Sequence, residues 1–572
     1  MIEECAKNTV QYSQEEHESE FVIATEKLEI AVNKETGICC YSDALTNKVY
    51  LKEAGKSLSP TDVIHYSTEE EESVVNRVKT VDGERNFIEN LKPYVERKAY
   101  RGKLLFNWDD DEAIHGLGQF EEGIYDYRHH GQYLYQHNMR ISIPFFISTK
   151  CYGIFIDCGS LMTFNDDENG SYIFMDTIEQ MDYYFIAGKC FDQIIEGYRF
   201  LTGHASMLPR WAFGYLQSKE AYKTGQELVD VVKRYRDIDV PIDCIIQDWN
   251  TWEPGKWGEK IVDSKRYPNL QETMKKIHDM NVHTMISIWP NMDAGTENHA
   301  EMTKAGYMLK DLSTYDVYNK NAQKLYWEQT DRELFSKGFD AWWCDSTEPF
   351  SGPDWNGEVK REPWERYLLV GNEHKKYIDA AKANTYGLYH AKGIYENQRN
   401  TTNGKRVVNL TRSNYASGQK YGIILWSGDI VAGWDVMKQQ IIEGLNFSMC
   451  GMPYWTLDIG GFFTVGTAWQ NRGCGSNQNP EPKWFWNGIY NDGVQDMGYR
   501  ELYVRWLEQA VFLPIFRSHG TDTPREIWNF GEKGDMFYDA IEKFIRLRYH
   551  LMPYIYTLAA DVHQKDVTMM RS

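Results

Sequence analysis

The chain has 572 residues, of which 42% are hydrophobic and 25% charged, so it can bury a large core and is not globally disordered. Its 62 basic and 83 acidic side chains leave a net charge of −21. This charge argues against nucleic acid and membranes as partners, because both bind basic surfaces. No run approaches the roughly 20 apolar residues that span a bilayer, and the acidic N-terminus does not resemble a signal peptide. We therefore expect a cytoplasmic protein that acts on a neutral or cationic ligand.

The cysteines and the aromatic side chains add two indications. The ten cysteines are scattered without a CxxC pair, and Cys39 and Cys40 are adjacent. This spacing favours free thiols in a reducing compartment over a disulfide framework or a zinc site. Aromatic residues make up 14% of the chain, including 19 Trp and 38 Tyr. Such a content is typical of a large aromatic core, and it also suits a cleft that stacks sugar faces on rings.

Up to about residue 200 the sequence consists of short segments rich in β-branched and aromatic residues. These segments are 21–24, 28–32, 141–147, 152–156 and 183–186, and turn-forming residues separate them. Many short strands with such turns predict an N-terminal β-sandwich, which we assign to residues 1–205.

From Trp211 onward, strand-like and helix-like segments alternate. We expect parallel strands at 212–217, 244–249, 284–289, 341–345, 407–411, 423–427, 454–458 and 515–519. Between the first two, Leu228, Val231, Val232 and Tyr235 follow the i, i+3, i+4, i+7 spacing of an amphipathic helix. This alternation predicts an α/β fold with a (β/α)8 TIM barrel over residues 206–572. The alternative is a doubly wound open sheet, which the lack of a Gly-rich phosphate loop disfavours.

Two connections after predicted strands are long. Residues 351–369 follow the fourth strand, and residues 464–498 follow the seventh. Both contain several aromatic residues: Trp355, Trp364 and Tyr367 in the first, and Trp469, Trp484, Phe485, Trp486 and Tyr490 in the second. Long loops at the C-terminal face of a barrel usually shape the active site, although we expect most of these aromatic side chains to pack the loops down.

Polar residues recur where the predicted strands end, which is the catalytic face of a barrel. One such Asp alone would more often cap a helix, and one Trp alone would more often belong to the core. The whole set places four carboxylates, an Arg, a His and two Trp around one mouth: Asp248, Asp345, Asp429, Asp458, Arg412, His519, Trp289 and Trp426. We therefore expect this set to form the functional site, whereas for Glu348 a structural role is equally well supported.

Converging carboxylates without Cys or His clusters suit either a metal site or glycoside hydrolysis. Hydrolysis needs one ionised carboxylate as nucleophile and a second carboxyl group that stays protonated as the acid. A metal site of carboxylates would normally include phosphate-handling residues or several His ligands. The two Trp and the acidic composition therefore favour a sugar substrate.

Four separated segments resemble the signatures of glycoside hydrolase family 31. They are 339–349 (FDAWWCDSTEP), 426–429 (WSGD), 458–462 (DIGGF) and 516–520 (FRSHG). The resemblance extends from about Ala113 to the end of the chain. It implies a retaining α-glycosidase on a (β/α)8 barrel that follows a β-sandwich, with an oligosaccharide or other glycoside as substrate.

The resemblance also implies a role for each site residue. Asp345 corresponds to the nucleophile and Asp429 to the general acid/base. The residues expected to contact the sugar are Asp248, Arg412, Asp458 and His519, as hydrogen-bonding groups, and Trp289 and Trp426, as walls. No metal or organic cofactor is implied. We expect the two catalytic carboxyl groups to lie about 5–5.5 Å apart, as in retaining enzymes.

The sequence Asp-Ser-Thr-Glu at 345–348 and the segment 247–252 resemble the branch of the family that holds bacterial α-xylosidases. We therefore favour α-xyloside or α-glucoside, also because the family's counterpart of Asp248 usually faces an equatorial C4 hydroxyl. The same branch includes α-galactosidases and α-N-acetylgalactosaminidases, which remain alternatives, as does an α-transglycosylase. A non-catalytic sugar-binding protein is the least favoured alternative, because both carboxylates are present.

In the family, C-terminal β-domains follow at about the position of Ser572, where the given sequence ends. We therefore expect these domains to be absent, an apolar patch to be exposed in their place, and the chain to form a homo-oligomer.

Overall fold

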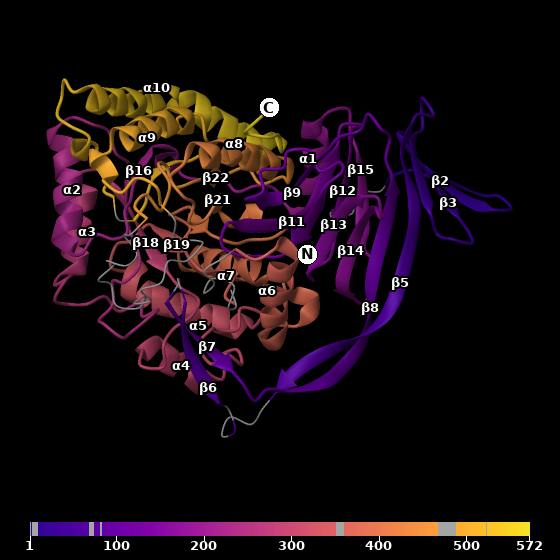
Figure 1. Cartoon of the computed structure of the whole chain (residues 1–572), viewed down its shortest axis with the longest axis horizontal. Helices are drawn as coiled ribbons and strands as arrows, with labels where there is room; N and C mark the ends of the chain where they lie inside the picture. The colour runs from indigo at the N-terminus through magenta and orange to yellow at the C-terminus, as the bar shows by residue number, and fades with distance from the viewer. Residues whose placement is uncertain are drawn as a thin grey trace.

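The computed structural model describes residues 2, 10–67, 72, 74–80, 83–350, 360–466, 488–521 and 523–571. Two bodies lie side by side (Figure 1): the indigo and purple strands form one, and a parallel barrel surrounded by helices forms the other. The protein is therefore an α/β protein in which a β-sandwich precedes a (β/α)8 barrel, as predicted.

Two antiparallel sheets form the N-terminal body. The larger sheet has nine strands in the order β1 (Ser13–Glu16), β2 (Glu20–Ala24), β3 (Leu28–Asn33), β4 (Cys39–Asp43), β5 (Val49–Ser67), β8 (Lys92–Asn107), β14 (Gly170–Ile178), β13 (Met162–Asp167) and β10 (Gly131–Leu134). The smaller sheet has four, in the order β15 (Tyr183–Ala187), β12 (Tyr152–Ile156), β11 (Arg140–Ser148) and β9 (Ile114–Phe120). Phe146 of the smaller sheet packs edge-on against Phe106 and Phe164 of the larger one, with ring centroids 5.6 and 6.1 Å apart. The two sheets thus share one aromatic core, as in a β-sandwich.

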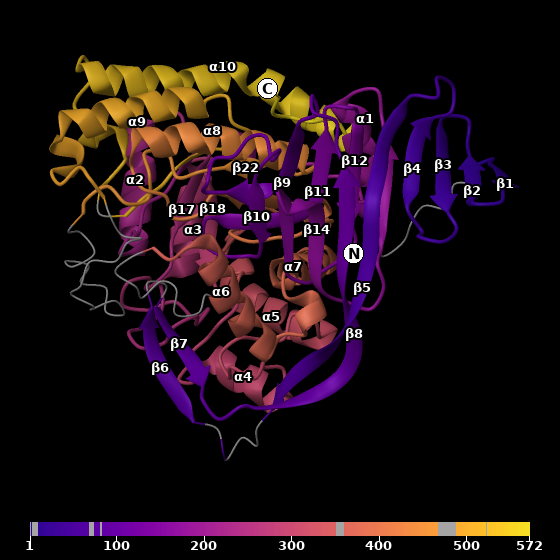
Figure 2. The ribbon, with the colours of Figure 1, turned by 45° about the vertical axis from the view of Figure 1, so that its right-hand side comes forward.

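Strands β5 and β8 continue beyond the sandwich as a long arm that curves below the barrel (Figure 2). A hairpin between them, β6 (Val75–Thr80) and β7 (Gly83–Ile88), contacts the barrel. Arg77 pairs with Asp293 at 3.8 Å, and Asn86 donates to the Asp311 carbonyl at 3.2 Å. The N-terminal body therefore touches the barrel through this hairpin as well as along its main side.

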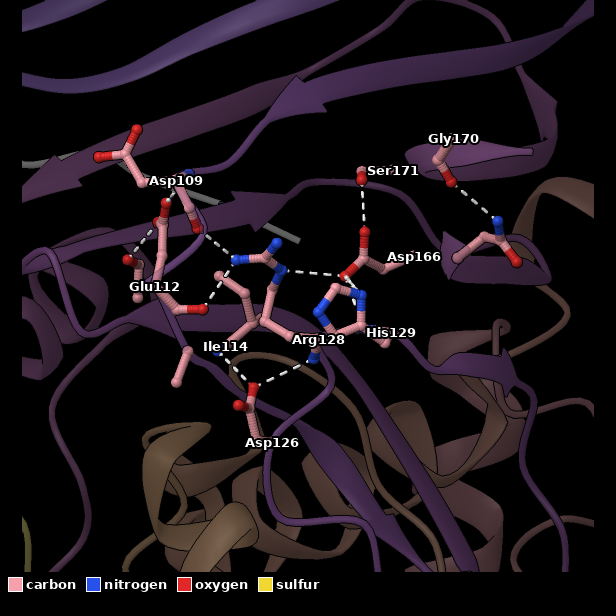
Figure 3. A network of polar contacts seen from close by, with 12 residues as sticks. Asp109, Glu112, Ile114, Asp126, Arg128, His129, Asp166, Gly170 and Ser171 are labelled. Carbon is pink, nitrogen blue, oxygen red and sulfur yellow. Dashed lines mark hydrogen bonds and ion pairs between the residues drawn. The ribbon is translucent and has the colours of Figure 1, made fainter. Parts of the chain in front are cut away.

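A network of buried polar groups connects the two sheets of the sandwich (Figure 3). The Arg128 guanidinium donates to Asp166 of β13 at 2.9 Å. It also donates to two carbonyls of the β8–β9 connection, those of Asp109 just after β8 and Glu112 just before β9, at 2.6 and 2.8 Å. Ser171 of β14 donates its hydroxyl to the same Asp166 carboxylate. Burial raises the pKa of Asp166, but the hydrogen bonds from Ser171 and the His129 N–H, together with Arg128, outweigh burial and lower it.

Eight parallel strands form the barrel. Their order is β22 (Trp455–Thr456), β21 (Ile423–Trp426), β20 (Asn409–Thr411), β19 (Ala341–Cys344), β18 (His283–Ile288), β17 (Cys244–Gln247), β16 (Tyr215–Gln217) and β23 (Phe516–Ser518). The ring closes between β22 and β23, where the Ile515 N–H donates to the Trp455 carbonyl at 3.3 Å and Ile459 bridges to Ser518. Each strand falls within a segment predicted from the sequence or extends it by one residue, so the prediction of eight strands is confirmed.

Helices surround the barrel. They are α2 (Gly225–Asp237), α3 (Leu270–Asp279), α4 (Glu297–Ala305), α5 (Lys320–Thr330), α6 (Pro363–Tyr377), α7 (Tyr386–Thr401), α8 (Trp434–Met449), α9 (Met497–Ala510) and α10 (Met536–Lys565), whereas α1 (Phe191–Thr202) lies between the two bodies in sequence. The alternation is imperfect, because the described residues between β20 and β21 contain only a short 3-10 helix at Gly418–Tyr421.

The first predicted strand begins too early in the sequence. Residues 210–213 form a 3-10 helix, in which the Ala212 N–H donates to the Pro209 carbonyl at 3.0 Å. Pro209 fixes its own backbone angle and starts this turn, so β16 begins only at Tyr215. Apolar composition alone could not separate this buried turn from the strand that follows.

Of the aromatic residues predicted in the two long loops, Trp355, Trp469, Trp484, Phe485 and Trp486 lie outside the described residues. Tyr367 is buried, whereas Trp364 is exposed on α6. In the described part of the chain, no helix has both the length and the apolar character to cross a bilayer, and every cysteine there is a free thiol.

We predict that Arg128→Ala lowers the free energy of unfolding by about 3 kcal/mol, because it leaves the buried Asp166 carboxylate without its cation. The difference from wild type should shrink in acid, since the lowered folded-state pKa of Asp166 gives stability above its ordinary pKa that is lost as the pH falls. Denaturant unfolding at several pH values measures this. Lys98→Ala is the control, because its pair with Asp62 is exposed and should contribute about 1 kcal/mol or less. Equal losses would contradict the prediction.

Candidate active site

The register of the barrel strands brings several predicted residues to one rim. Strands β18, β19 and β20 end in register, so the residues that follow them, Trp289, Asp345 and Arg412, lie on adjacent strands. Trp426, the last residue of β21, lies opposite Arg412 in the same register. Parallel strands thus present their C-terminal side chains to one mouth, the usual place of a barrel active site.

Arg412 lies at the centre of this mouth and is buried. Its Nη1 is 3.3 Å from Asp345 Oδ1 and 3.6 Å from Asp429 Oδ2. Because both oxygens lie so close to one nitrogen, they are at most about 7 Å apart, which is compatible with the about 5–5.5 Å of retaining enzymes. The two carboxylates predicted to do the chemistry therefore share one cation.

Glu348 holds this cation in place. Its Oε1 accepts hydrogen bonds from Arg412 Nε at 2.6 Å and from Arg412 Nη2 at 2.5 Å, and both side chains are buried. Charge-assisted contacts of this kind are strong and directional. The geometry therefore favours a structural role for Glu348, which is to orient Arg412.

The backbone after β19 sets the direction of Asp345. Its Oδ1 accepts the Ser346 N–H at 2.7 Å. Ser346 has φ +53°, in the left-handed region that residues other than glycine rarely adopt. This sharp turn directly after the strand aims the Asp345 carboxylate at Arg412.

A residue of the N-terminal body holds Asp429. Asn138, between β10 and β11, donates its Nδ2 to Asp429 Oδ2 at 2.7 Å and accepts the Asp429 N–H on its Oδ1 at 3.1 Å. The preceding Gly428 has φ +82°, and a Cβ there would lie 2.3 Å from Asn138 Oδ1. Asn138 was not predicted from the sequence, because nothing in the neighbouring sequence indicates a contact with a residue 291 positions away.

Asp458, which follows β22, and Arg517, within β23, form a buried pair. The Arg517 Nη2 donates to Asp458 Oδ1, and the guanidinium lies over the Trp343 ring at 5.0 Å from its centroid. Burial raises the pKa of Asp458, although Arg517 and Arg525 oppose this change.

The described residues contain no group of three or more His, Cys, Asp or Glu that could hold a metal ion.

His519 and Asp248 lie close together beside this pair. His519 Nε2 is 3.8 Å from Asp248 Oδ2, and its Nδ1 is 2.7 Å from the Ser218 hydroxyl. Burial lowers the pKa of His519 well below its usual range, with a further contribution from Arg517. Burial also raises the pKa of Asp248 well above its usual range, and the charge of Glu220 adds to this. The lowered pKa of His519 favours the neutral imidazole, which has one donor and one acceptor nitrogen.

Two groups of tryptophan rings line the mouth. Trp289 packs edge-on against Trp257 at 4.8 Å, and Trp426 packs edge-on against Trp343 at 5.4 Å. Among the described residues, the buried indole N–H groups of all four find no acceptor. Trp343, which sequence reasoning missed, also contacts His519 at 4.7 Å; its position inside β19 gave no signal beyond that of a core residue.

We predict that Glu348→Gln lowers the free energy of unfolding by about 2–4 kcal/mol, because it leaves the buried Arg412 without its strongest partner. Denaturant unfolding measures this loss. The control is Glu328→Gln, which removes an exposed pair with Lys324 and should change stability by less than about 1 kcal/mol. A loss for Glu348→Gln as small as that of the control would contradict the assigned role.

Comparisons with known proteins agree with this architecture. The family model described as "Glycosyl hydrolases family 31 TIM-barrel domain" matches residues 205–558. An alpha-xylosidase of Saccharolobus solfataricus is 34% identical over 548 residues, which cover 92% of this chain and 69% of that protein. An alpha-glucosidase of the same organism is 26% identical, over 86% of this chain and 70% of that protein.

A solved structure is also similar, that of a GH31 alpha-xylosidase from Xanthomonas citri. It superposes with a TM-score of 0.81 at 25% identity, covering 98% of this chain and 73% of that one. The chain therefore belongs to glycoside hydrolase family 31 and is a retaining α-glycosidase.

Proposed function

We propose that the protein is an α-xylosidase that removes terminal α-linked xylose from an oligosaccharide or other glycoside. The observation that supports the chemistry is the position of Asp345 and Asp429 on one guanidinium nitrogen of Arg412. The choice of sugar rests on similarity, because the alpha-xylosidase of S. solfataricus is 34% identical and the alpha-glucosidase of that organism only 26%.

In this proposal Asp345 is the nucleophile and Asp429 is the general acid/base. A bond forms between an Asp345 oxygen and the anomeric carbon, while the bond to the leaving oxygen breaks and that oxygen takes the proton of Asp429. Water then attacks the glycosyl-aspartate and gives a proton back to Asp429. Arg412 stabilises the ionised form of Asp345, which attacks in the first step and is restored when the sugar is released in the second.

The remaining site residues would bind the sugar. Asp248, whose pKa is raised, can donate as well as accept a hydrogen bond to a hydroxyl, and the neutral His519 beside it can do the same. Asp458 and Arg517 offer charge-assisted contacts. Trp289 and Trp426 would wall the ring, with indole N–H groups free to donate.

We predict that, among aryl α-glycosides, the α-xyloside has the highest kcat/KM and the α-glucoside comes next, at least about tenfold above the α-galactoside and the α-N-acetylgalactosaminide. The equatorial C4 hydroxyl expected opposite Asp248 separates the first two sugars from the last two, and the order of xyloside before glucoside rests on the greater similarity to the alpha-xylosidase. Initial rates of aryl release measure the order. A preference for the axial C4 hydroxyl would contradict the choice of sugar while leaving the catalytic pair intact.

We predict that Asp429→Ala slows an aryl glycoside with a poor leaving group by about 10²–10⁴-fold, because only that group needs the proton. The rate of glycosidic bond cleavage should fall far less for a 2,4-dinitrophenyl glycoside. Pre-steady-state release of the aryl group measures this rate for both substrates. Asp435→Ala, on the neighbouring α8, is the control and should behave as wild type. Equal losses on both substrates would rule out Asp429 as the acid.

A further inference from the structure

The two contacts between Asn138 and Asp429 fix the orientation of the Asn138 amide. A backbone N–H can only donate, so the amide atom that faces the Asp429 N–H must be the oxygen. The other amide atom, Nδ2, then donates to Asp429 Oδ2 at 2.7 Å. Oδ2 is therefore an acceptor in this contact, and a proton on the carboxyl group cannot lie between it and Nδ2.

A second group acts on the same oxygen. Arg412 Nη1 lies 3.6 Å from Asp429 Oδ2, so both the amide hydrogen and the guanidinium charge favour negative charge there. When Asp429 is protonated, the proton is therefore most stable on Oδ1.

The loop that carries Asn138 is itself fixed. Asn138 is fully buried, and the neighbouring Gln136 donates to the Ser142 carbonyl at 2.9 Å and accepts from the Ser413 hydroxyl at 3.2 Å. Gly428 lets this loop approach, because a Cβ there would also lie 2.6 Å from the Met139 nitrogen. A residue of the sandwich is thus held rigidly against the loop that follows β21.

We propose that Asn138 is a positioning residue for proton transfer: it fixes Asp429 Oδ2 as an acceptor, so that Oδ1 carries the proton given to the leaving group. This inference rests on the proposed role of Asp429 as general acid/base. In the first step the Oδ1 proton moves to the leaving oxygen as the glycosidic bond breaks and the bond to Asp345 forms. In the second step Oδ1 takes a proton from the attacking water.

The test compares Asn138→Asp, which keeps the shape and the acceptor but replaces the donor Nδ2 by oxygen, with Asn138→Ala. We expect kcat/KM for a phenyl glycoside to fall about tenfold in both variants, and that for the 2,4-dinitrophenyl glycoside less than about twofold. The basic limb of the phenyl-glycoside pH profile should move up by about one unit, since the ionised carboxylate loses a donor. The shift should be larger for Asn138→Asp, which adds a like charge.

Asn446→Ala is the matched control. Asn446 is also buried and also makes two hydrogen bonds between the bodies, to the Gly116 N–H at 3.1 Å and the Ile124 carbonyl at 2.6 Å, but away from Asp429. It should lose stability without a leaving-group effect or a shift in the pH profile. If both Asn138 variants fail to fold, Gly428→Ala reaches the same contact from the barrel and should reproduce the leaving-group effect.

Losses that are equal for the two glycosides, or an unchanged basic limb, would overturn the proposal. The Asp429→Ala variant separates this failure from failure of the proposed function. If Asp429→Ala shows the leaving-group dependence and the Asn138 variants do not, only the role of Asn138 is wrong.

Discussion

The site depends on one buried cation. Arg412 is almost completely enclosed and has three carboxylates around it, those of Glu348, Asp345 and Asp429. Burying a charge is costly unless it is paired and hydrogen-bonded. Glu348 neutralises the guanidinium through two of its nitrogens, which leaves the third to face the proposed catalytic pair, Asp345 and Asp429. A retaining enzyme needs one of that pair ionised and the other protonated, and with Glu348 in place the site then carries a single net negative charge.

The barrel supplies both carboxylates of the proposed catalytic pair, but it does not hold both of them by itself. Asp345 follows its strand directly and is oriented by its own chain. Asp429 comes three residues after β21 and is held by Asn138 from the sandwich. The interface between the two bodies therefore reaches the proposed active site, and under the proposed roles of Asp429 and Asn138 the N-terminal sandwich contributes to catalysis as well as to the fold.

Much of this arrangement could be predicted from the sequence. The eight barrel strands are apolar runs that end in polar residues, and parallel strands bring such ends together whatever the loops do. Asp345, Arg412 and Trp289 were predictable for that reason. Asn138, Ser218 and Trp343 were not. Asn138 and Ser218 act through contacts between segments far apart in sequence, and Trp343 lies in the middle of a strand, where a buried Trp is normally core. The predicted beginning of the first barrel strand was wrong, because a buried 3-10 turn and a buried strand have the same apolar composition.

The four carboxylates of the mouth differ in their surroundings, and this difference agrees with the division between reaction and recognition in the proposed mechanism. Asp345 and Asp429 face the same guanidinium nitrogen, where negative charge is favoured. In the described part of the chain, Asp248 instead has an imidazole beside it, that of His519, whose pKa burial lowers well below its usual range. Burial raises the pKa of Asp248 well above its usual range, which favours the protonated carboxyl group and suits it to binding hydroxyls rather than to attack. Asp458 pairs with a different guanidinium, that of Arg517. What sets Asp345 and Asp429 apart is that both face the same nitrogen of Arg412, as the proposed reaction requires.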